Sequence, residues 1–214
     1  MTLKIFIIAL LVESIVLHEI AHGWVALLFG DHTAQRQGRI TLNPIAHIDP
    51  LWTIAIPVIA YFISNGTCII GGAKPVPVDP RNYRKPVQGD ICVSAAGVAV
   101  NFLIAVIMIL LLNIVHFVSG DLTGSAAAYV LLHAALLNIV LAMFNLIPIP
   151  PLDGSHLFKY LLPTGLRSKY EMLGRTGAGF IILILIINIP GLWHVFSAGF
   201  LAVGDFLLNN LIFF

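Results

Sequence analysis

Long apolar runs constrain this chain more than any other feature of its sequence. A helix that rises 1.5 Å per residue needs about 20 mostly apolar residues to cross the hydrocarbon core of a bilayer. The composition fits this requirement, because 59% of the residues are hydrophobic and only 10% are charged. Runs that predict membrane-spanning helices lie at about residues 4–29, 90–118, 127–147, 176–189 and 192–213. We therefore expect an all-α polytopic membrane protein, with residues 1–214 forming a single domain.

A shorter apolar run, residues 51–63, is too short for a regular span and contains Pro57. We expect it to be re-entrant or interfacial, which leaves five spans; if it crosses the membrane, there are six. In the five-span arrangement every Lys and Arg except Lys4 falls on one side of the bilayer. Because Lys and Arg collect in cytoplasmic loops, this arrangement predicts an outside N-terminus and a cytoplasmic C-terminus in a cell membrane.

Two segments between the apolar runs have an extended pattern. Residues 38–42 alternate in polarity, and residues 68–72 form a short apolar run that leads into the proline-rich stretch 73–80. Patterns of this kind are typical of short strands. We therefore expect a small β element at the membrane edge.

The pentad at residues 18–22, His-Glu-Ile-Ala-His, lies inside the first apolar run. Ionisable groups at membrane depth are costly and usually face a bundle interior or a water-filled cavity. Residues four apart share one face of a helix, so His18 and His22 can present two imidazoles to one metal ion, with Glu19 beside them as a base. The alternative is a pair of polar side chains that only bond to neighbouring helices.

A catalytic zinc site normally has three protein ligands, so the two histidines require one more. The best candidate is Asp153, which follows a stretch containing Pro148, Pro150 and Pro151. These prolines must end the preceding helix, and irregular backbone at membrane depth is tolerated only where protein buries it or it lines a cavity. The alternative is that Asp153 caps the helix that follows. If Asp153 is not the ligand, His156 is the next candidate.

These motifs resemble those of the site-2 protease family of intramembrane zinc metalloproteases. The resemblance rests on HEIAHG at residues 18–23, Gly71-Gly72 in the middle, and NLIPIPPLDG at residues 145–154, in that order. It is closest to the compact form without PDZ or CBS domains. One departure lies in the third helix, where the family pattern GPxxN is replaced by Gly-Val-Ala-Val-Asn at residues 97–101.

The resemblance implies a role for each matching residue. His18, His22 and Asp153 correspond to the ligands of one Zn²⁺ per chain, and Glu19 corresponds to the catalytic base. Asn145 matches a polar residue that holds the substrate or stabilises the transition state. Gly71 and Gly72 would allow close approach of an extended substrate, although paired glycines are as often a bulge or a turn.

The expected activity is a zinc-dependent endopeptidase that cuts membrane-spanning or membrane-proximal segments. The expected partners are a transmembrane protein or peptide and the lipid bilayer. The net charge of +1 and the lack of a block of like charges exclude nucleic acid. Two other classes remain: a metal-ion transporter using the same histidines, and a non-catalytic scaffold that binds transmembrane helices.

Overall fold

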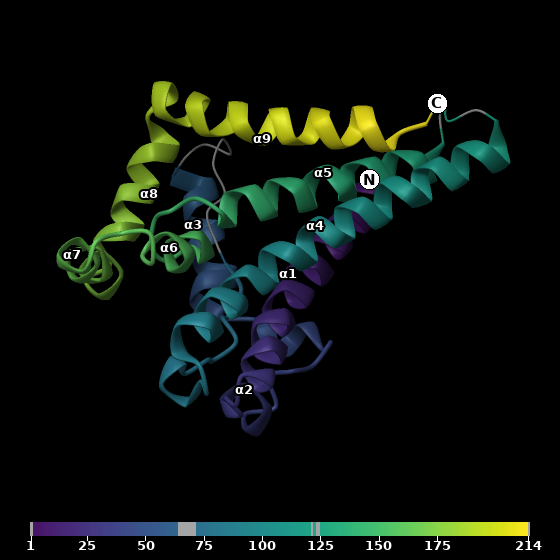
Figure 1. The fold of residues 1–214 in the computed structure, drawn as a ribbon. Coiled ribbons are helices and arrows are strands. Elements are labelled where there is room, and N and C mark those ends of the chain that lie inside the picture. Colours follow the sequence, from purple (N-terminus) through teal and green to yellow (C-terminus); the bar gives the residue numbers. More distant parts are fainter. Residues whose placement is uncertain (1, 64–71, 121, 123–124, 214) are drawn as a thin grey trace.

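The computed structural model describes residues 2–213 except 64–71, 121, 123 and 124. Within these residues the protein is all-α, as predicted (Figure 1). The helices are α1 (Thr2–Leu28), α2 (Thr33–Arg36), α3 (Ile56–Ile63), α4 (Pro86–Ser119), α5 (Ala126–Asn145), α6 (Asp153–Phe158), α7 (Thr164–Arg175), α8 (Ala178–Asn188) and α9 (Pro190–Leu211). Shorter turns are the 3-10 turns Pro44–His47 and Pro80–Asn82 and the π-helical turn Pro50–Ala55.

Helices α1, α4 and α5 form the central bundle (Figure 1). Small buried residues let their backbones approach closely; these are Ala26, Ala105, Ala134, Ala135 and Ala142. A buried hydrogen bond from Asn138 Nδ2 to Ser14 Oγ, 2.9 Å long, ties α5 to α1. The α4 helix starts with Pro86 and ends at Gly120, whose left-handed φ of 71° closes the last turn. The spans predicted at 4–29, 90–118 and 127–147 are therefore confirmed as long helices.

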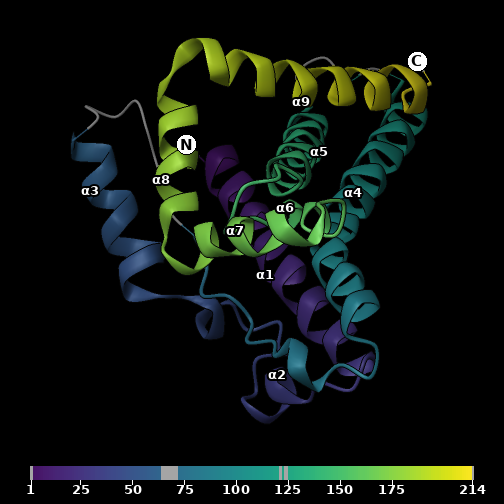
Figure 2. The ribbon, with the colours of Figure 1, turned by 60° about the vertical axis from the view of Figure 1, so that its left-hand side comes forward.

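The C-terminal third agrees with the prediction in one helix and differs in another. The span expected at 192–213 is the long helix α9, one of the candidate membrane spans. The span expected at 176–189 is the 11-residue helix α8, only about 16 Å long at 1.5 Å per residue. A Pro-Gly pair between two apolar runs predicts a tight turn and a helical hairpin at Pro190-Gly191. Figure 2 shows α9 leaving α8 sideways instead, so this hairpin does not form. In the described part of the chain, four helices are long and apolar enough to cross a membrane. A fifth is reached if α7 and α8, bent by 80°, count as one broken span.

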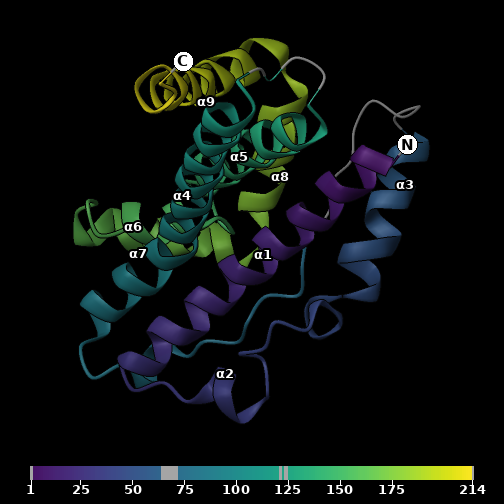
Figure 3. The ribbon, with the colours of Figure 1, turned by 90° about the vertical axis from the view of Figure 1, so that its right-hand side faces the viewer.

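The short run 51–63 folds as the π-helical turn Pro50–Ala55 followed by α3. Neither piece reaches the length of a membrane span, which agrees with the expectation of a segment that does not cross as a regular helix. Figures 2 and 3 show α3 standing apart from the central bundle, on the side of α1 away from α4. Its re-entrant or interfacial position stays a prediction.

The expected strand at residues 38–42 is wrong. Gly38 is part of a turn with φ of 62°, and no strand occurs among the described residues. In this region side chains, and not a partner strand, form hydrogen bonds to the backbone. Arg39 Nη2 donates to the carbonyls of Lys74 and Pro75, and His47 Nε2 bonds the carbonyl of Thr41 at 3.0 Å. Of the second expected strand, residues 68–71 lie outside the described residues, and Gly72 begins an extended but unpaired segment.

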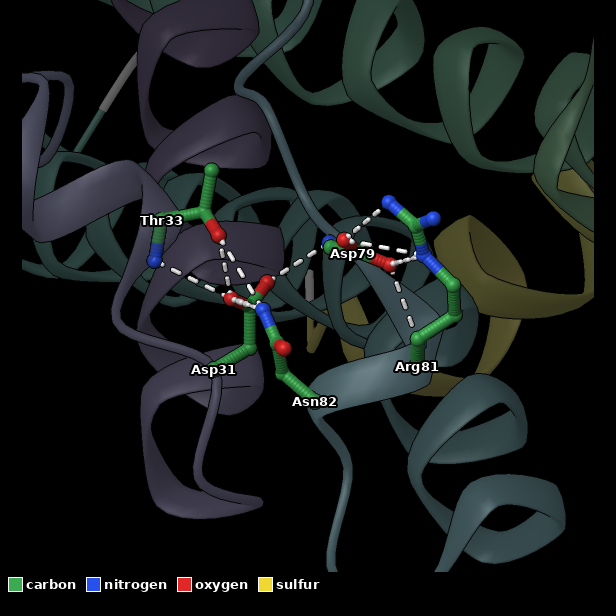
Figure 4. A network of polar contacts seen from close by, with 5 residues as sticks. All are labelled: Asp31, Thr33, Asp79, Arg81 and Asn82. Atoms are coloured by element: carbon green, nitrogen blue, oxygen red, sulfur yellow. Dashed lines mark hydrogen bonds and ion pairs between the residues drawn. The ribbon is translucent and has the colours of Figure 1, made fainter.

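A polar network fixes that extended segment to the end of α1 (Figure 4). Asp31, only 1% exposed, accepts hydrogen bonds from Thr33, from the Asp79 amide at 2.7 Å and from Asn82 Nδ2 at 2.9 Å. Burial alone would raise the pKa of Asp31, but these hydrogen bonds outweigh it and lower the pKa below the usual value. Asp79 in turn pairs with Arg81. The segment from Gly72 to Asp79 is therefore held at a defined position beside α1.

Candidate metal centre

The two histidines of the pentad point from α1 toward the same spot. His18 Nε2 lies 3.0 Å from His22 Nε2, and Asp153 Oδ2 lies 3.2 Å from the first and 3.4 Å from the second. His18, His22 and Asp153 thus form a candidate metal-binding group within the described residues. The fold thus brings Asp153 to two histidines that lie some 130 positions earlier in the sequence.

The size of this triangle fits a zinc ion. Zinc bonds to nitrogen and carboxylate oxygen are about 2.0 to 2.1 Å, so the ligand atoms of a tetrahedral site lie about 3.3 to 3.4 Å apart. Asp153 Oδ2 is also buried and receives no hydrogen bond from the described part of the chain. A buried carboxylate oxygen without a donor is costly, whereas a cation between it and the two imidazoles would satisfy it.

Backbone and side-chain bonds orient both imidazoles. His22 Nδ1 lies 2.7 Å from the carbonyl of Val93 on α4. Because a carbonyl only accepts, Nδ1 must carry the hydrogen, so in the neutral imidazole the lone pair is on Nε2, the atom that lies beside Asp153. Metal-binding histidines almost always donate their other ring nitrogen in this way. The orientation of His22 is therefore that of a metal ligand.

His18 has the same kind of support from Asn101. The Asn101 amide nitrogen lies 3.2 Å from His18 Nδ1, while Asn101 Oδ1 is buried and accepts no hydrogen bond among the described residues. The amide oxygen and nitrogen of Asn are assigned from the hydrogen-bond network. Turning this amide over lets Oδ1 accept from His18 Nδ1–H and frees His18 Nε2 as a ligand, so we assign that orientation.

Gly97 on α4 leaves the space that the two imidazoles occupy. A Cβ at this position would lie 2.5 Å from His18 Cε1 and 2.6 Å from the Nε2 atoms of His18 and His22. Such distances are far inside van der Waals contact, so only glycine fits here. The sequence marked Gly97 and Asn101 solely as parts of the altered GPxxN pattern. Their spacing of one helical turn was the only signal of a shared role.

Asp153 reaches the site because α5 ends early. The chain between Asn145 and Asp153 is irregular, with a cis peptide between Pro150 and Pro151, and Asp153 is the first residue of α6. Leu152, not Asp153, holds the capping position, so the capping alternative for Asp153 is wrong. At Gly154 an added Cβ would overlap the carbonyl of Leu146. Glycine after the aspartate therefore lets α6 pack against the end of α5.

Glu19 and Asn145 line one cavity of about 460 Å³ with His18. Glu19 Oε2 accepts a hydrogen bond of 2.7 Å from the amide of Val76, which stands between Pro75 and Pro77. The Asn145 amide donates to the carbonyl of Leu141 at 3.0 Å. The extended segment and α8 contribute further lining residues, which are Gly72, Ala73, Pro75, Phe180, Leu183, Ile184 and Ile187. The lining is completed by Ile15, Asn101, Leu141, Phe144, Pro151 and Leu152. Gly71 lies outside the described residues.

His156 is not part of the metal group. Its Nδ1 lies 3.1 Å from Asp90 Oδ1 on α4, which directs the ring away from the three ligand atoms. The expectation that His156 could replace Asp153 as third ligand therefore has no geometric support.

In this helical multi-pass protein two histidines and an aspartate form one candidate metal group, and one of the histidines lines a cavity together with a glutamate. This arrangement is that of the membrane-embedded metallopeptidases. The chain is a member of Peptidase family M50, the site-2 protease family, whose profile matches residues 5–124 and 112–186. No solved structure gives a significant match to the sequence.

Several curated proteins are similar to the chain. YwhC of Bacillus subtilis, described as a candidate zinc metalloprotease, is 36% identical over 206 residues, which is 93% of this chain and 89% of the relative. Rip2 of Mycolicibacterium smegmatis, described in the same way, is 29% identical over 88% of this chain and 68% of its own length. Zinc metalloprotease MJ0392 of Methanocaldococcus jannaschii is 24% identical over 84% of this chain and 42% of the relative.

Proposed function

We propose that this chain is a zinc-dependent intramembrane endopeptidase in which His18, His22 and Asp153 hold one Zn²⁺. The observation that carries this proposal is the triangle of His18 Nε2, His22 Nε2 and Asp153 Oδ2, 3.0 to 3.4 Å on a side. Two neutral imidazole nitrogens and a carboxylate oxygen at these distances are the donor set and the spacing that a zinc ion takes. The zinc metalloproteases among the relatives support the choice of metal and argue against a transporter or a silent scaffold.

Zinc bound at these residues would supply the Lewis acidity that polarises a peptide carbonyl and lowers the pKa of a bound water to about 7. Glu19 accepts the proton of the attacking water and delivers it to the leaving amine. The Val76 amide holds Glu19 Oε2, so Oε1 is the oxygen that exchanges protons. Holding one oxygen fixes the direction of the other, which is what a general base requires.

Asn145, at the end of α5, positions the substrate from another part of the cavity lining. One of its two amide hydrogens bonds the Leu141 carbonyl, which fixes the plane of the side chain. The second hydrogen remains to bond the carbonyl oxygen of the scissile peptide as negative charge develops on it. Donors that are already oriented stabilise such charge without reorganisation.

The substrate enters as an extended peptide. A transmembrane helix hides its amides in internal hydrogen bonds, so it must unwind locally before cleavage, and an extended peptide can add to an exposed backbone edge. The segment from Gly72 to Asp79 is extended, and Gly72, Ala73 and Pro75 line the cavity beside Glu19. We place the substrate along this segment, with Gly71 and Gly72 allowing close approach.

The positions of Lys and Arg indicate which end of the bundle faces the cytoplasm. Apart from Lys4, the Lys and Arg residues lie in and just after α2, in the segment before α4, directly after α6 and in α7. These regions lie toward the end of the bundle where α1 terminates (Figure 1). By the positive-inside rule this end faces the cytoplasm. The N-terminus is then outside, and the entrance to the site is cytoplasmic. The cytoplasmic C-terminus expected from the sequence does not fit this direction, because Leu211 and Phe213 bond Asn113 in the distal half of α4, at the end of the bundle away from the Lys- and Arg-rich regions.

The decisive experiment measures zinc content and cleavage separately in purified, detergent-solubilised protein. Glu19→Gln should keep one zinc per chain and lose cleavage of a transmembrane peptide substrate by about 10³-fold or more, because it removes the base but no ligand. Asp153→Ala should lose zinc as well as cleavage. Undiminished cleavage by Glu19→Gln, or full zinc retention by Asp153→Ala, would contradict the assignment.

A further inference from the structure

A buried carboxylate on α4, Asp90, is not explained by the zinc chemistry. Its side chain is 6% exposed, and three donors surround it: His156 Nδ1 at 3.1 Å, Lys159 Nζ at 2.5 Å and the Tyr160 hydroxyl at 2.8 Å. A buried carboxylate is tolerated only when it is paired and hydrogen-bonded. The number of partners shows that Asp90 is fully engaged.

All three donors come from one short stretch of chain. His156, Lys159 and Tyr160 lie on the turn that ends α6, with the spacing that places residues on one face of a helix. The first residue of α6 is Asp153, one turn earlier. This six-residue helix packs against α4 and the end of α5, and the bonds to Asp90 tie its last turn to α4.

Asp90 also lies on the face of α4 that contacts the two histidines of the metal centre. Val93 supplies the carbonyl for His22, Gly97 leaves room for both imidazoles, and Asn101 bonds His18. Together with Asp90 these positions advance by three or four residues, so they share one face of α4. One helix face thus contacts the two histidines directly and the third ligand through α6.

We propose that Asp90 is a positioning residue for the Asp153 ligand: by anchoring the last turn of α6 to the same face of α4 that orients the histidines, it sets the distance between Asp153 and the imidazoles. This proposal rests on Asp153 being a zinc ligand, as stated under the proposed function. It assigns Asp90 no contact with substrate or metal. The effect of Asp90 is expected in metal affinity and ligand geometry.

The test compares Asp90→Asn with Asn113→Ala. Asn113 lies on the distal half of α4 and ties that helix to the carbonyl of Leu211 and the amide of Phe213, so its loss also breaks interhelical hydrogen bonds. Zinc affinity is measured by competition with a chelator, and ligand geometry by the visible absorption spectrum of the Co²⁺-substituted protein. Asp90→Asn should bind zinc about tenfold more weakly, as for residues that orient ligands, with a shifted Co²⁺ spectrum. Asn113→Ala should change neither.

A second measurement needs no metal. In the metal-free protein, hydrogen exchange of the α6 amides should be faster in Asp90→Asn and in Tyr160→Phe than in the wild type, and unchanged in Asn113→Ala. Wild-type zinc affinity and spectrum in Asp90→Asn would overturn the positioning role, as would unchanged exchange in α6. If the wild-type chain itself bound no zinc, the proposed function would fail first, while the exchange result would still report whether Asp90 anchors α6.

Discussion

The two halves of α4 bury different kinds of side chain. The half nearer the N-terminus buries the polar side chains of Asp90, Ser94 and Asn101 as well as Val93 and Val98, whereas the buried side chains of the distal half are all apolar: Ala105, Ile109 and Leu112. Both halves pass through the same bundle, so depth in the protein does not explain the contrast. Polar groups are buried where a ligand must be oriented, and apolar groups where helices need only to pack. One helix therefore carries a functional half and a packing half.

The largest effect should come from Gly97→Ala in the functional half. The added Cβ would overlap both imidazoles, so we expect zinc affinity to fall by at least about 100-fold, the upper end for changes around metal ligands. Zinc content and chelator competition measure this. Gly199→Ala is the matched control, because nothing lies within 4 Å of a Cβ there. Normal zinc binding by Gly97→Ala would show that the N-terminal half of α4 does not shape the metal site, and the functional half would then not differ from the packing half.

Asn101 should have the next largest effect, and its substitutions separate two orientations of its amide. Asn101→Ala removes the partner of His18 Nδ1 and should weaken zinc binding about tenfold. Asn101→Asp can accept from His18 Nδ1–H but cannot donate, so it should bind zinc more tightly than Asn101→Ala. Equal losses in both variants, measured by chelator competition, would show that the amide donates to His18 instead.

The smallest effect on the metal is expected in the packing half. Ile109 is fully buried, so Ile109→Ala should lower the free energy of unfolding by about 2 kcal/mol or more. Zinc affinity should not change. Ile107 is 42% exposed on the same helix and provides the control, since Ile107→Ala should leave the free energy of unfolding nearly unaltered. Denaturant titration in mixed micelles measures both, and weakened zinc binding in Ile109→Ala would blur the boundary between the halves.

Much of this arrangement could be predicted from the sequence because it depends on short periodic patterns. The spacing of His18 and His22 gives two groups on one helical face, and the apolar runs of α1, α4 and α5 are long enough to leave little choice. The prolines before Asp153 gave a physical reason to expect a broken helix there. The candidate metal group in the structure consists of these same three residues.

The remainder depends on partners that leave no local pattern. The carbonyl of Val93 orients His22, but every residue has a carbonyl, so its sequence could not reveal this role. The strand expected at 38–42 is absent because Arg39 and His47 side chains satisfy distant backbone groups. The hairpin expected at Pro190 is absent because a Pro-Gly pair permits a turn without fixing the direction in which the next helix leaves.

The Pro-Val-Pro triplet at residues 75–77 restricts how the extended segment can align with the proposed base Glu19. Val76 supplies the only amide hydrogen of the triplet, and that hydrogen goes to Glu19. If the segment slid by one residue in either direction, a proline nitrogen without a hydrogen would face the carboxylate, and the bond would be lost. A slide by two in one direction would require the Lys74 amide, which already bonds the carbonyl of His47. The triplet therefore excludes the two alignments next to the observed one, and each of them carries an energetic penalty.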